Sequence, residues 1–224
     1  HICLPVQSKK PWLMWRNAHA LKKIIREQHV DIVHARSRAP AWSCFWATNQ
    51  TKTPYITTFH GAYGHSNKLK RWYNSVMLRG TSTIAVSNFI AKHISENYQA
   101  SYPKLLHKDK IHVIHRGIDT EAFSASNVPV ARLNALKEKW NLPADKTIIM
   151  LPGRLTRLKG HTVFIDAISQ LKHKNIICLF VGDHHGNIHY QQELQTKIAQ
   201  RHLEKFIYLV GGCHDMAAAY QLSD

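Results

Sequence analysis

The 224-residue sequence lacks several features that would place it in a familiar class. No apolar run approaches the roughly 18 residues that a membrane-spanning helix needs. No basic-then-apolar leader opens the chain, and no C-x-x-C pair occurs. This pattern argues against a zinc ribbon or a disulfide scaffold and predicts reduced thiols in a cytoplasmic protein. The four cysteines are Cys3, Cys44, Cys178 and Cys213.

Familiar phosphate and metal motifs are also missing. The chain has no G-x-G-x-x-G, and the Lys-Gly-His at 159–161 does not fit a Walker A loop, in which Lys follows the last Gly and precedes Ser or Thr. The stretch "GDHHGNIH" holds His184, His185 and His189, but their spacing matches no zinc pattern and no cysteine lies nearby. We therefore expect no bound metal and no cofactor.

Acidic residues are scarce in the first half of the chain. Residues 1–116 carry 18 Lys and Arg against 4 Asp and Glu, whereas residues 117–224 carry 12 against 10. Such an asymmetry indicates an anionic partner for the first half. Nucleic acid, an anionic membrane surface and a phosphorylated substrate all qualify, and charge alone does not choose among them.

Short apolar, β-branched runs alternate with amphipathic helical patterns along the whole chain. Near-continuous apolar strands indicate parallel sheets that are covered on both faces, and their alternation with helices is typical of βαβ units. The predicted fold class is α/β. The strands are expected at 31–35, 54–59, 82–87, 111–115, 147–153, 176–182 and 206–210, and the helices near 17–28, 40–50, 67–79, 88–98, 129–140, 161–172, 189–202 and 215–222.

The stretch 115–129 is the least periodic part of the chain, and the charge balance changes there. It predicts an N-terminal domain at 1–116, a linker at 117–128 and a C-terminal domain at 129–224. The first domain opens in mid-pattern without a first strand, and the second stops after three strands. We therefore expect both domains to be truncated and the chain to be the middle of a longer protein.

One predicted helix, 67–79, combines an apolar face with basic residues. At 100° per residue its apolar side chains share one face, which predicts packing on the sheet. The basic remainder is either a solvated surface or a surface that meets anionic lipid headgroups. The apolar face consists of Leu69, Trp72, Tyr73, Val76 and Met77, and the basic residues are Lys68, Lys70, Arg71 and Arg79.

The segment "LPGRLTRLKGH" at 151–161 carries positive charge where a strand hands over to a helix. Ligands of open α/β sheets bind beyond the carboxyl ends of the strands, and free N–H groups at a helix start attract anions. With Gly153 allowing close approach, Arg154 and Lys159 there would suit a phosphate or diphosphate. From the residues alone, a solvated basic loop is an equal alternative.

Six blocks in this order resemble glycosyltransferase family 4: "VDIVHARSRAPAW", "TTFHG", "IAVSNFIAKHI", "VIHRGID", "LPGRLTRLKGH" and "LFVGD". The resemblance covers most of the chain. It implies the GT-B fold, two Rossmann-like doubly wound domains that face a cleft, and a retaining enzyme that uses a nucleotide-sugar donor. The residues of "HARSRAPAW" and "LPGRLTRLKG" resemble those of a proteobacterial branch of this family that assembles lipopolysaccharide and other envelope glycolipids.

The resemblance also implies roles for particular residues. Gly153, Arg154 and Lys159 would hold the donor diphosphate and neutralise the charge that builds on it, which can replace a bound metal. His60 of "TTFHG" would contact the transferring sugar and assist the transition state, and Gly61 would keep that turn open.

Two further predictions concern "LFVGD" and "HARSRAP". Gly182 and Asp183 would border the nucleotide pocket, although Asp183 could equally be a helix cap. Arg36 and Arg38 follow a strand and, with Gly61, would hold an anionic acceptor; ordinary loop cations are the alternative for the two arginines.

The sequence departs from the family pattern in two places. Where the family often has Pro-Asn-Gly, this chain has His115, Arg116 and Gly117. The family's paired-glutamate motif, Glu-x7-Glu, would lie beyond Asp224, and its glycine-rich loop after the first strand has no counterpart. We therefore expect this chain to be an inactive fragment of an active enzyme.

The leading hypothesis is a retaining glycosyltransferase that moves a sugar from a nucleotide-sugar to a lipopolysaccharide, glycolipid or other anionic envelope acceptor. It would act in the cytoplasm, peripherally on the inner face of the inner membrane. The alternatives are a basic nucleic-acid-binding protein and a non-catalytic nucleotide-binding module. No helix-turn-helix, RNP or zinc-finger pattern supports the first alternative, so we expect no nucleic acid partner.

Overall fold

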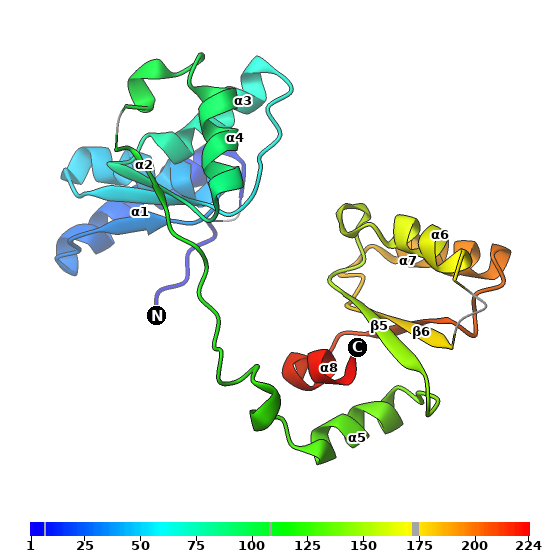
Figure 1. Cartoon of the computed structure of the whole chain (residues 1–224). Coiled ribbons are helices and arrows are strands. Elements are labelled where there is room, and N and C mark those ends of the chain that lie inside the picture. Colours follow the sequence, from blue (N-terminus) through cyan, green and yellow to red (C-terminus); the bar gives the residue numbers. More distant parts are fainter. Residues whose placement is uncertain (7, 108, 172–174) are drawn as a thin grey trace. The chain divides into compact units, whose positions relative to one another are not determined.

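The computed structural model describes residues 1–6, 8–107, 109–171 and 175–224 (Figure 1). The chain divides into two compact units, His1–Gly117 and Ile118–Asp224. This division falls beside the predicted boundary at residue 116.

Unit 1 is built on a four-stranded parallel sheet in the order β1-β2-β3-β4. Each strand lies within a predicted strand range, so the α/β prediction is confirmed for this unit. The elements are α1 (Pro11–Glu27), β1 (Val33–Ala35), α2 (Arg38–Thr51), β2 (Tyr55–Phe59), α3 (Lys68–Asn74), the 3-10 helix η1 (Ser75–Leu78), β3 (Ser82–Ala85), α4 (Asn88–Tyr98), the 3-10 helix η2 (Pro103–Leu105) and β4 (Ile111–Val113).

The two faces of this sheet have different neighbours. Side chains alternate along a strand, so odd-numbered residues of β2 share one face. On that face, the Tyr55 hydroxyl donates to the Ala41 carbonyl of α2, and the Thr57 hydroxyl donates to the Met77 carbonyl of η1. Phe59 meets the ring of Tyr98 at the end of α4. The even-numbered residues therefore point to the opposite face.

The prediction of one long apolar face over 67–79 is wrong. The α-helix ends at Asn74, and a 3-10 helix follows. Val76 and Met77 are fully buried, but Leu69 is 72% exposed and Trp72 is 47% exposed. The cause is tertiary: the buried Asn74 side chain donates to the Gly64 carbonyl and to the Tyr98 hydroxyl, which holds the chain where the helix type changes.

Unit 2 contains a three-stranded parallel sheet in the order β5-β6-β7. The middle strand is buried along its whole length, as the predicted apolar run requires. The elements are the 3-10 helix η3 (Ala125–Asn127), α5 (Val130–Lys139), β5 (Thr147–Pro152), the 3-10 helix η4 (Arg157–Lys159), α6 (His161–Ser169), β6 (Ile176–Val181), α7 (Ile188–Gln200), β7 (Ile207–Gly211) and α8 (Met216–Leu222).

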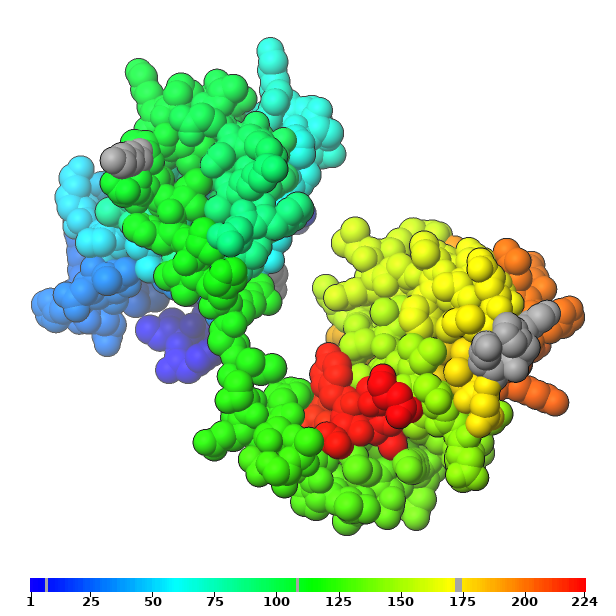
Figure 2. Space-filling view, in the orientation of Figure 1, coloured from blue at the N-terminus to red at the C-terminus, as the bar shows by residue number. Residues whose placement is uncertain are grey.

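Two apolar clusters cover the two faces of the unit 2 sheet. One includes residues of α6 and α7, such as Ile165 and Leu194, and the other includes residues of α5 and α8, such as Leu136 and Ala218. Figure 2 shows α8 lying against α5. Within the described ranges, no helix is both long enough and apolar enough to cross a bilayer.

Candidate functional site

The loop between β5 and α6 holds the predicted diphosphate residues, and its shape depends on two glycines. Gly153 has φ of 145° and Gly160 has φ of 73°, values that disfavour any residue with a Cβ. Gly160 is the N-cap of α6, so the helix begins directly after it. The loop therefore lies at the carboxyl end of β5 and at the free N–H groups of a helix, where anions bind favourably.

Gly182 fixes this loop against the next strand. A Cβ atom built on Gly182 would lie 2.1 Å from the carbonyl oxygen of Gly153, so the two backbones touch. The Gly153 N–H donates to the Val181 carbonyl at 2.8 Å, and the Leu155 N–H donates to the Asp183 carbonyl at 3.0 Å. The requirement for glycine at 182 is therefore one of packing between two strand ends.

Asp183 has a different contact from the one that a helix cap would make. Its carboxylate accepts a hydrogen bond of 2.9 Å from the Gly212 N–H, beyond the end of β7. The next helix, α7, has Asn187 as its N-cap. The helix-cap alternative for Asp183 is wrong, and its role at a nucleotide pocket stays a prediction.

The three cations of the loop fall into two groups. Arg157 donates two hydrogen bonds to Glu193, at 2.8 and 2.5 Å, and lies over the ring of Tyr190. In the described part of the chain, the Arg154 and Lys159 side chains have neither an ion pair nor a hydrogen bond. One cation therefore holds the loop on α7, and two are left for a ligand.

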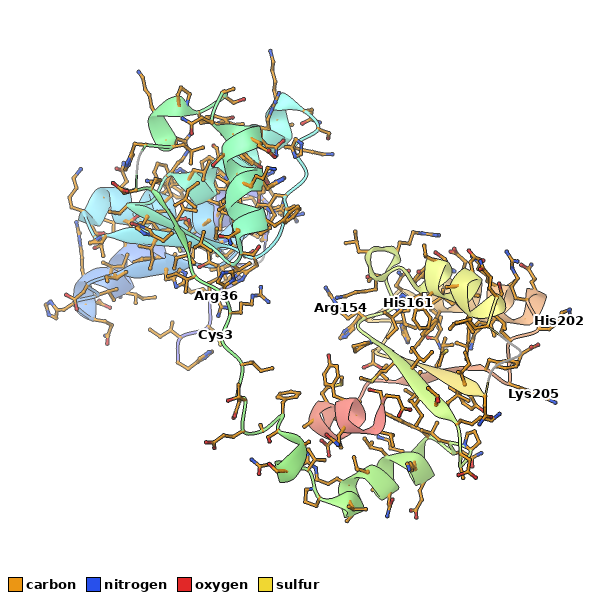
Figure 3. All side chains as sticks on the ribbon, viewed as in Figure 1. Cys3, Arg36, Arg154, His161, His202 and Lys205 are labelled. Atoms are coloured by element: carbon orange, nitrogen blue, oxygen red, sulfur yellow. The ribbon has the colours of Figure 1, made fainter. Side chains whose placement is uncertain are left out.

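His161, the first residue after this loop, has a structural position that the sequence did not indicate. It is fully buried and packs against the rings of Phe180 and Tyr190, with centroid distances of 5.0 and 6.0 Å. Burial lowers the pKa of His161, so the imidazole is neutral at neutral pH and adds no charge to the loop. Figure 3 shows Arg154 and His161 at one end of the unit 2 sheet and His202 and Lys205 at the other.

In unit 1, a hollow of about 560 Å³ lies at the carboxyl ends of the four strands. The residues that line it from β1, β2 and β3 and the loops after them are even-numbered, so it lies on the sheet face opposite α2, η1 and α4. No Asp or Glu lines it. The lining residues are His34, Arg36, Thr58, His60, Ile84, Val86, Ile114, His115, Arg116 and Gly117.

His60 stands between two arginines in this hollow. Its Nδ1 lies 2.7 Å from a terminal guanidinium nitrogen of Arg116, and its Nε2 lies 3.3 Å from Nε of Arg36. Burial, followed by the charges of Arg116 and Arg36 and by His34, lowers the pKa of His60. The ring is therefore neutral at neutral pH. Nearby, His34 shares a hydrogen bond of 2.7 Å with the Thr58 hydroxyl.

The structure does not bring Arg36 and Arg38 together. Arg38 donates to the Asn74 side chain at 3.0 Å and lies over the ring of Tyr63, 4.4 Å from its centroid. It lines a different hollow, beside Leu69 and Trp72. A Cβ on Gly61 would meet nothing within 4 Å, so packing does not require a glycine there.

The sequence predicted His60 and Arg36 but missed Arg116 as their neighbour. The signal was present, because Arg116 stands where the resembling family often has Asn, yet only its contact with Nδ1 of His60 in the structure shows that it reaches that ring. Over the described residues, no group of three or more His, Cys, Asp or Glu side chains is placed to hold a metal ion.

Two parallel α/β units, each with a polar site beyond the carboxyl ends of its strands, fit the GT-B fold that the sequence predicted. The description "Glycosyltransferase Family 4" matches residues 1–122, and "Glycosyl transferases group 1" matches residues 134–224. The chain belongs to glycosyltransferase family 4, as its six sequence blocks predicted.

Solved structures and curated proteins agree with this assignment. A glycosyltransferase from Rickettsia africae ESF-5 is 40% identical, with a TM-score of 0.84 over 100% of this chain and 57% of that one. HepE of Anabaena, solved with UDP-glucose, is 18% identical with a TM-score of 0.78 over 92% of this chain and 54% of its own, and shows the fold alone.

Among curated proteins, D-inositol 3-phosphate glycosyltransferase 1 of Catenulispora acidiphila is 29% identical over 97 residues. That match spans 41% of this chain and 22% of the relative. The chain thus covers little more than half of the solved relatives and a smaller share of the curated one. The lipopolysaccharide branch suggested by the sequence stays a prediction.

Proposed function

We propose that the protein to which this chain belongs transfers a sugar from a nucleotide-sugar donor to an anionic acceptor, with retention of configuration. The observation that carries the proposal is the β5–α6 loop, where Arg154 and Lys159 have no carboxylate partner among the described residues. The acceptor class we propose is a lipopolysaccharide, a glycolipid or another envelope glycan.

On the donor side, the diphosphate would lie against Gly153 with Arg154 and Lys159 around it. Arg provides a forked contact and Lys a compact charge, and the first N–H groups of α6 add a favourable dipole. These charges would stabilise the leaving diphosphate as the glycosidic bond breaks. We propose that they supply the charge that a metal ion would otherwise provide. The relative solved with UDP-glucose has the same fold and supports such a donor.

On the sugar side, we propose that His60 contacts the transferring sugar. It follows β2 directly, so a rigid strand fixes its backbone. Its lowered pKa keeps the imidazole neutral, so it can accept or donate a hydrogen bond to a sugar hydroxyl at neutral pH. Departure of the diphosphate and attack by the acceptor on the same face would then preserve the anomeric configuration.

The acceptor and the membrane surface are assigned to unit 1 because of its charge. Arg36, Arg38 and Gly61 stay our candidates for acceptor contacts. The exposed Leu69 and Trp72 lie among basic residues of α3, a combination that suits an anionic inner-membrane surface. We propose a cytoplasmic enzyme that rests on that surface without spanning it.

The nucleotide pocket would be completed by Gly182 and Asp183 and by residues of the family's Glu-x7-Glu motif. That motif is absent from this sequence. The 224 residues therefore carry the diphosphate loop without the glutamates, and we expect them to bind a nucleoside diphosphate without turning over a donor.

Calorimetric titration of UDP, GDP and ADP into this chain, in moderate salt without metal, tests the proposal. We expect one diphosphate to bind and the Arg154→Ala/Lys159→Ala variant to lose that binding. The matched control is Lys137→Ala/Lys205→Ala, which removes two exposed unit 2 cations outside the loop.

Random-sequence DNA in the same titration tests the nucleic-acid alternative. Tight, salt-dependent binding of DNA that the loop variant leaves unchanged, together with no diphosphate binding, would overturn the glycosyltransferase proposal. A longer chain that includes the glutamate motif distinguishes an incomplete site from a wrong assignment. Continued failure to bind any diphosphate there would sink the proposal.

A further inference from the structure

Three basic side chains converge in unit 1 from the ends of three different strands. Arg36 follows β1, His60 follows β2, and Arg116 lies three residues beyond the end of β4. All three line the same hollow on the even-numbered face of the sheet. The strands that precede them belong to one parallel sheet, so the fold brings the three residues to the same edge of that sheet.

The hydrogen bonding of this cluster is incomplete. Both guanidinium groups are donors and cannot accept. A neutral imidazole has only one nitrogen that accepts, yet each nitrogen of His60 faces an arginine. Whichever tautomer His60 adopts, one arginine points an N–H group at another N–H group. An additional acceptor between the two arginines would resolve this conflict.

The charge of the cluster is also uncompensated. No Asp or Glu lines the hollow, and in the described part of the chain Arg36 and Arg116 have no hydrogen-bond partner except His60. Two guanidinium groups beside one imidazole, with no counter-charge, favour an anion. Arg116 stands where the resembling family often has Asn, so the family pattern does not account for this second guanidinium group.

We propose that Arg36, His60 and Arg116 form a binding site for a phosphate group, and that this group belongs to the acceptor. The second half of this statement rests on the proposed function. A phosphate offers at least three oxygens in a tetrahedral arrangement, enough to accept from donors that approach from three strand ends. A carboxylate has two oxygens in one plane and matches a single arginine fork better.

This site is formed by unit 1 residues, whereas Arg154 and Lys159 belong to unit 2. In this proposal His60 contacts two groups, the transferring sugar and the acceptor phosphate. A phosphate between the arginines would release both ring nitrogens of His60 from the guanidinium groups. The phosphorylated class of acceptor and the position of the imidazole would therefore be linked.

The first test is titration of inorganic phosphate and glucose 6-phosphate into this chain at low salt, with glucose and glucuronic acid as comparison ligands. We expect both phosphates to bind, and glucose not to. Arg116→Gln and Arg36→Gln should each weaken phosphate binding about 10-fold or more, the loss expected for one charged hydrogen bond. Lys104→Gln, an exposed cation in the same unit with the same charge change, should leave it unchanged.

A second readout keeps the test valid where a variant is partly unfolded. The imidazole signals of His60, followed by NMR, should shift when phosphate is added, and the midpoint of their titration should rise because a bound anion stabilises the imidazolium. A phosphate-dependent shift at surface histidines but not at His60 would contradict the proposed site.

The remaining outcomes separate this inference from the proposed function. No binding of either phosphate, or equal binding of glucuronic acid, would overturn the phosphate assignment. Loss of UDP binding in Arg116→Gln would show that the anion is the donor's diphosphate and overturn the acceptor assignment. Loss of UDP binding in Arg154→Ala/Lys159→Ala, with glucose 6-phosphate binding retained, supports two independent sites.

Discussion

The two units use their charged residues in opposite ways. In unit 2, the described ion pairs join separate elements: Arg132 with Asp215, Arg157 with Glu193, and Lys197 and Arg201 with Asp166. In unit 1, the described ion pairs are Lys23 with Glu27 and Lys92 with Glu96, each within one turn of one helix. The described ion pairs of unit 2 thus tie helices and loops together, whereas those of unit 1 each stay within one helix.

This difference decides in which unit an unpaired cation indicates a ligand site. In a unit with nearly balanced charge, a loop that leaves Arg154 and Lys159 unpaired while engaging Arg157 points to a ligand. In unit 1, an unpaired cation is ordinary, because 18 basic residues among its first 116 face 4 acidic ones. In unit 1, a ligand site is indicated instead by cations from different strands that meet at one place, as Arg36 and Arg116 do around His60.

The largest expected effect is at the packed backbone of unit 2. Gly182→Ala places a Cβ against the Gly153 carbonyl, so the β5–α6 loop must move. We expect a destabilisation of unit 2 of about 3 kcal/mol and loss of diphosphate binding. Hydrogen exchange of unit 2 peptides at increasing urea concentration measures the stability of this unit separately from unit 1.

Gly61→Ala is the matched control for this change. Its Cβ meets nothing within 4 Å and its φ is not in the left-handed region, so stability should change little. Equal effects of the two substitutions would show that packing at Gly182 does not determine the loop.

A cross-element ion pair should matter more than one along a helix. Asp215 accepts two hydrogen bonds from Arg132 and one from the Ala218 N–H as the N-cap of α8. Asp215→Asn keeps a capping side chain and should cost about 0.5 kcal/mol, while Asp215→Ala should cost about 1 kcal/mol more. Glu27→Gln in unit 1 should cost less than either.

The pH dependence of this cost has a definite sign. The hydrogen bond from Arg132 lowers the pKa of Asp215 below that of an unfolded Asp. The stabilisation is therefore present above the unfolded pKa and is lost as pH falls through the folded one. Unfolding curves of the wild type and Asp215→Asn should converge in acid, and a constant difference would exclude the ion pair as the cause.

Added salt should affect the stability of the two units differently. Screening weakens the self-repulsion of unit 1 and the ion pairs of unit 2 as the Debye length falls from about 30 Å at 0.01 M to about 10 Å at 0.1 M. Hydrogen exchange read peptide by peptide should show unit 1 becoming more protected and unit 2 unchanged or slightly less so. A gain of protection in unit 2 alone would reverse the comparison.

The smallest effect concerns a single titration. Burial and the nearby arginines lower the pKa of His60, so Arg116→Gln should raise it. NMR of the imidazole in phosphate-free buffer measures the midpoint directly. Lys104→Gln removes the same charge elsewhere in the unit and should leave the midpoint in place.

The sequence was sufficient for elements whose pattern is local. The apolar run 176–182 predicted β6, and the segment 151–161 predicted the transition from β5 to the helix that follows it. It failed where distant residues decide. The Asn74 side chain, bonded to Gly64 and Tyr98, ends α3 and leaves Leu69 and Trp72 exposed, which no helical period reveals.

The candidate site residues show the same contrast between local and distant signals. The β5–α6 loop is contiguous in sequence, so its positive charges are visible in the sequence itself. Arg36, His60 and Arg116 are separated by 24 and 56 residues and meet because the strands that precede them run parallel in one sheet. Sequence alone cannot show that they surround one hollow.

The contact between Gly182 and Gly153 also bears on how this chain could be redesigned. Two strand ends 29 positions apart in the chain have interlocking main chains, so neither can be exchanged alone for the matching stretch of a relative. A chimera that aims at a different sugar nucleotide would need to transplant 151–155 and 181–183 as a single block, with Gly212 kept beneath Asp183.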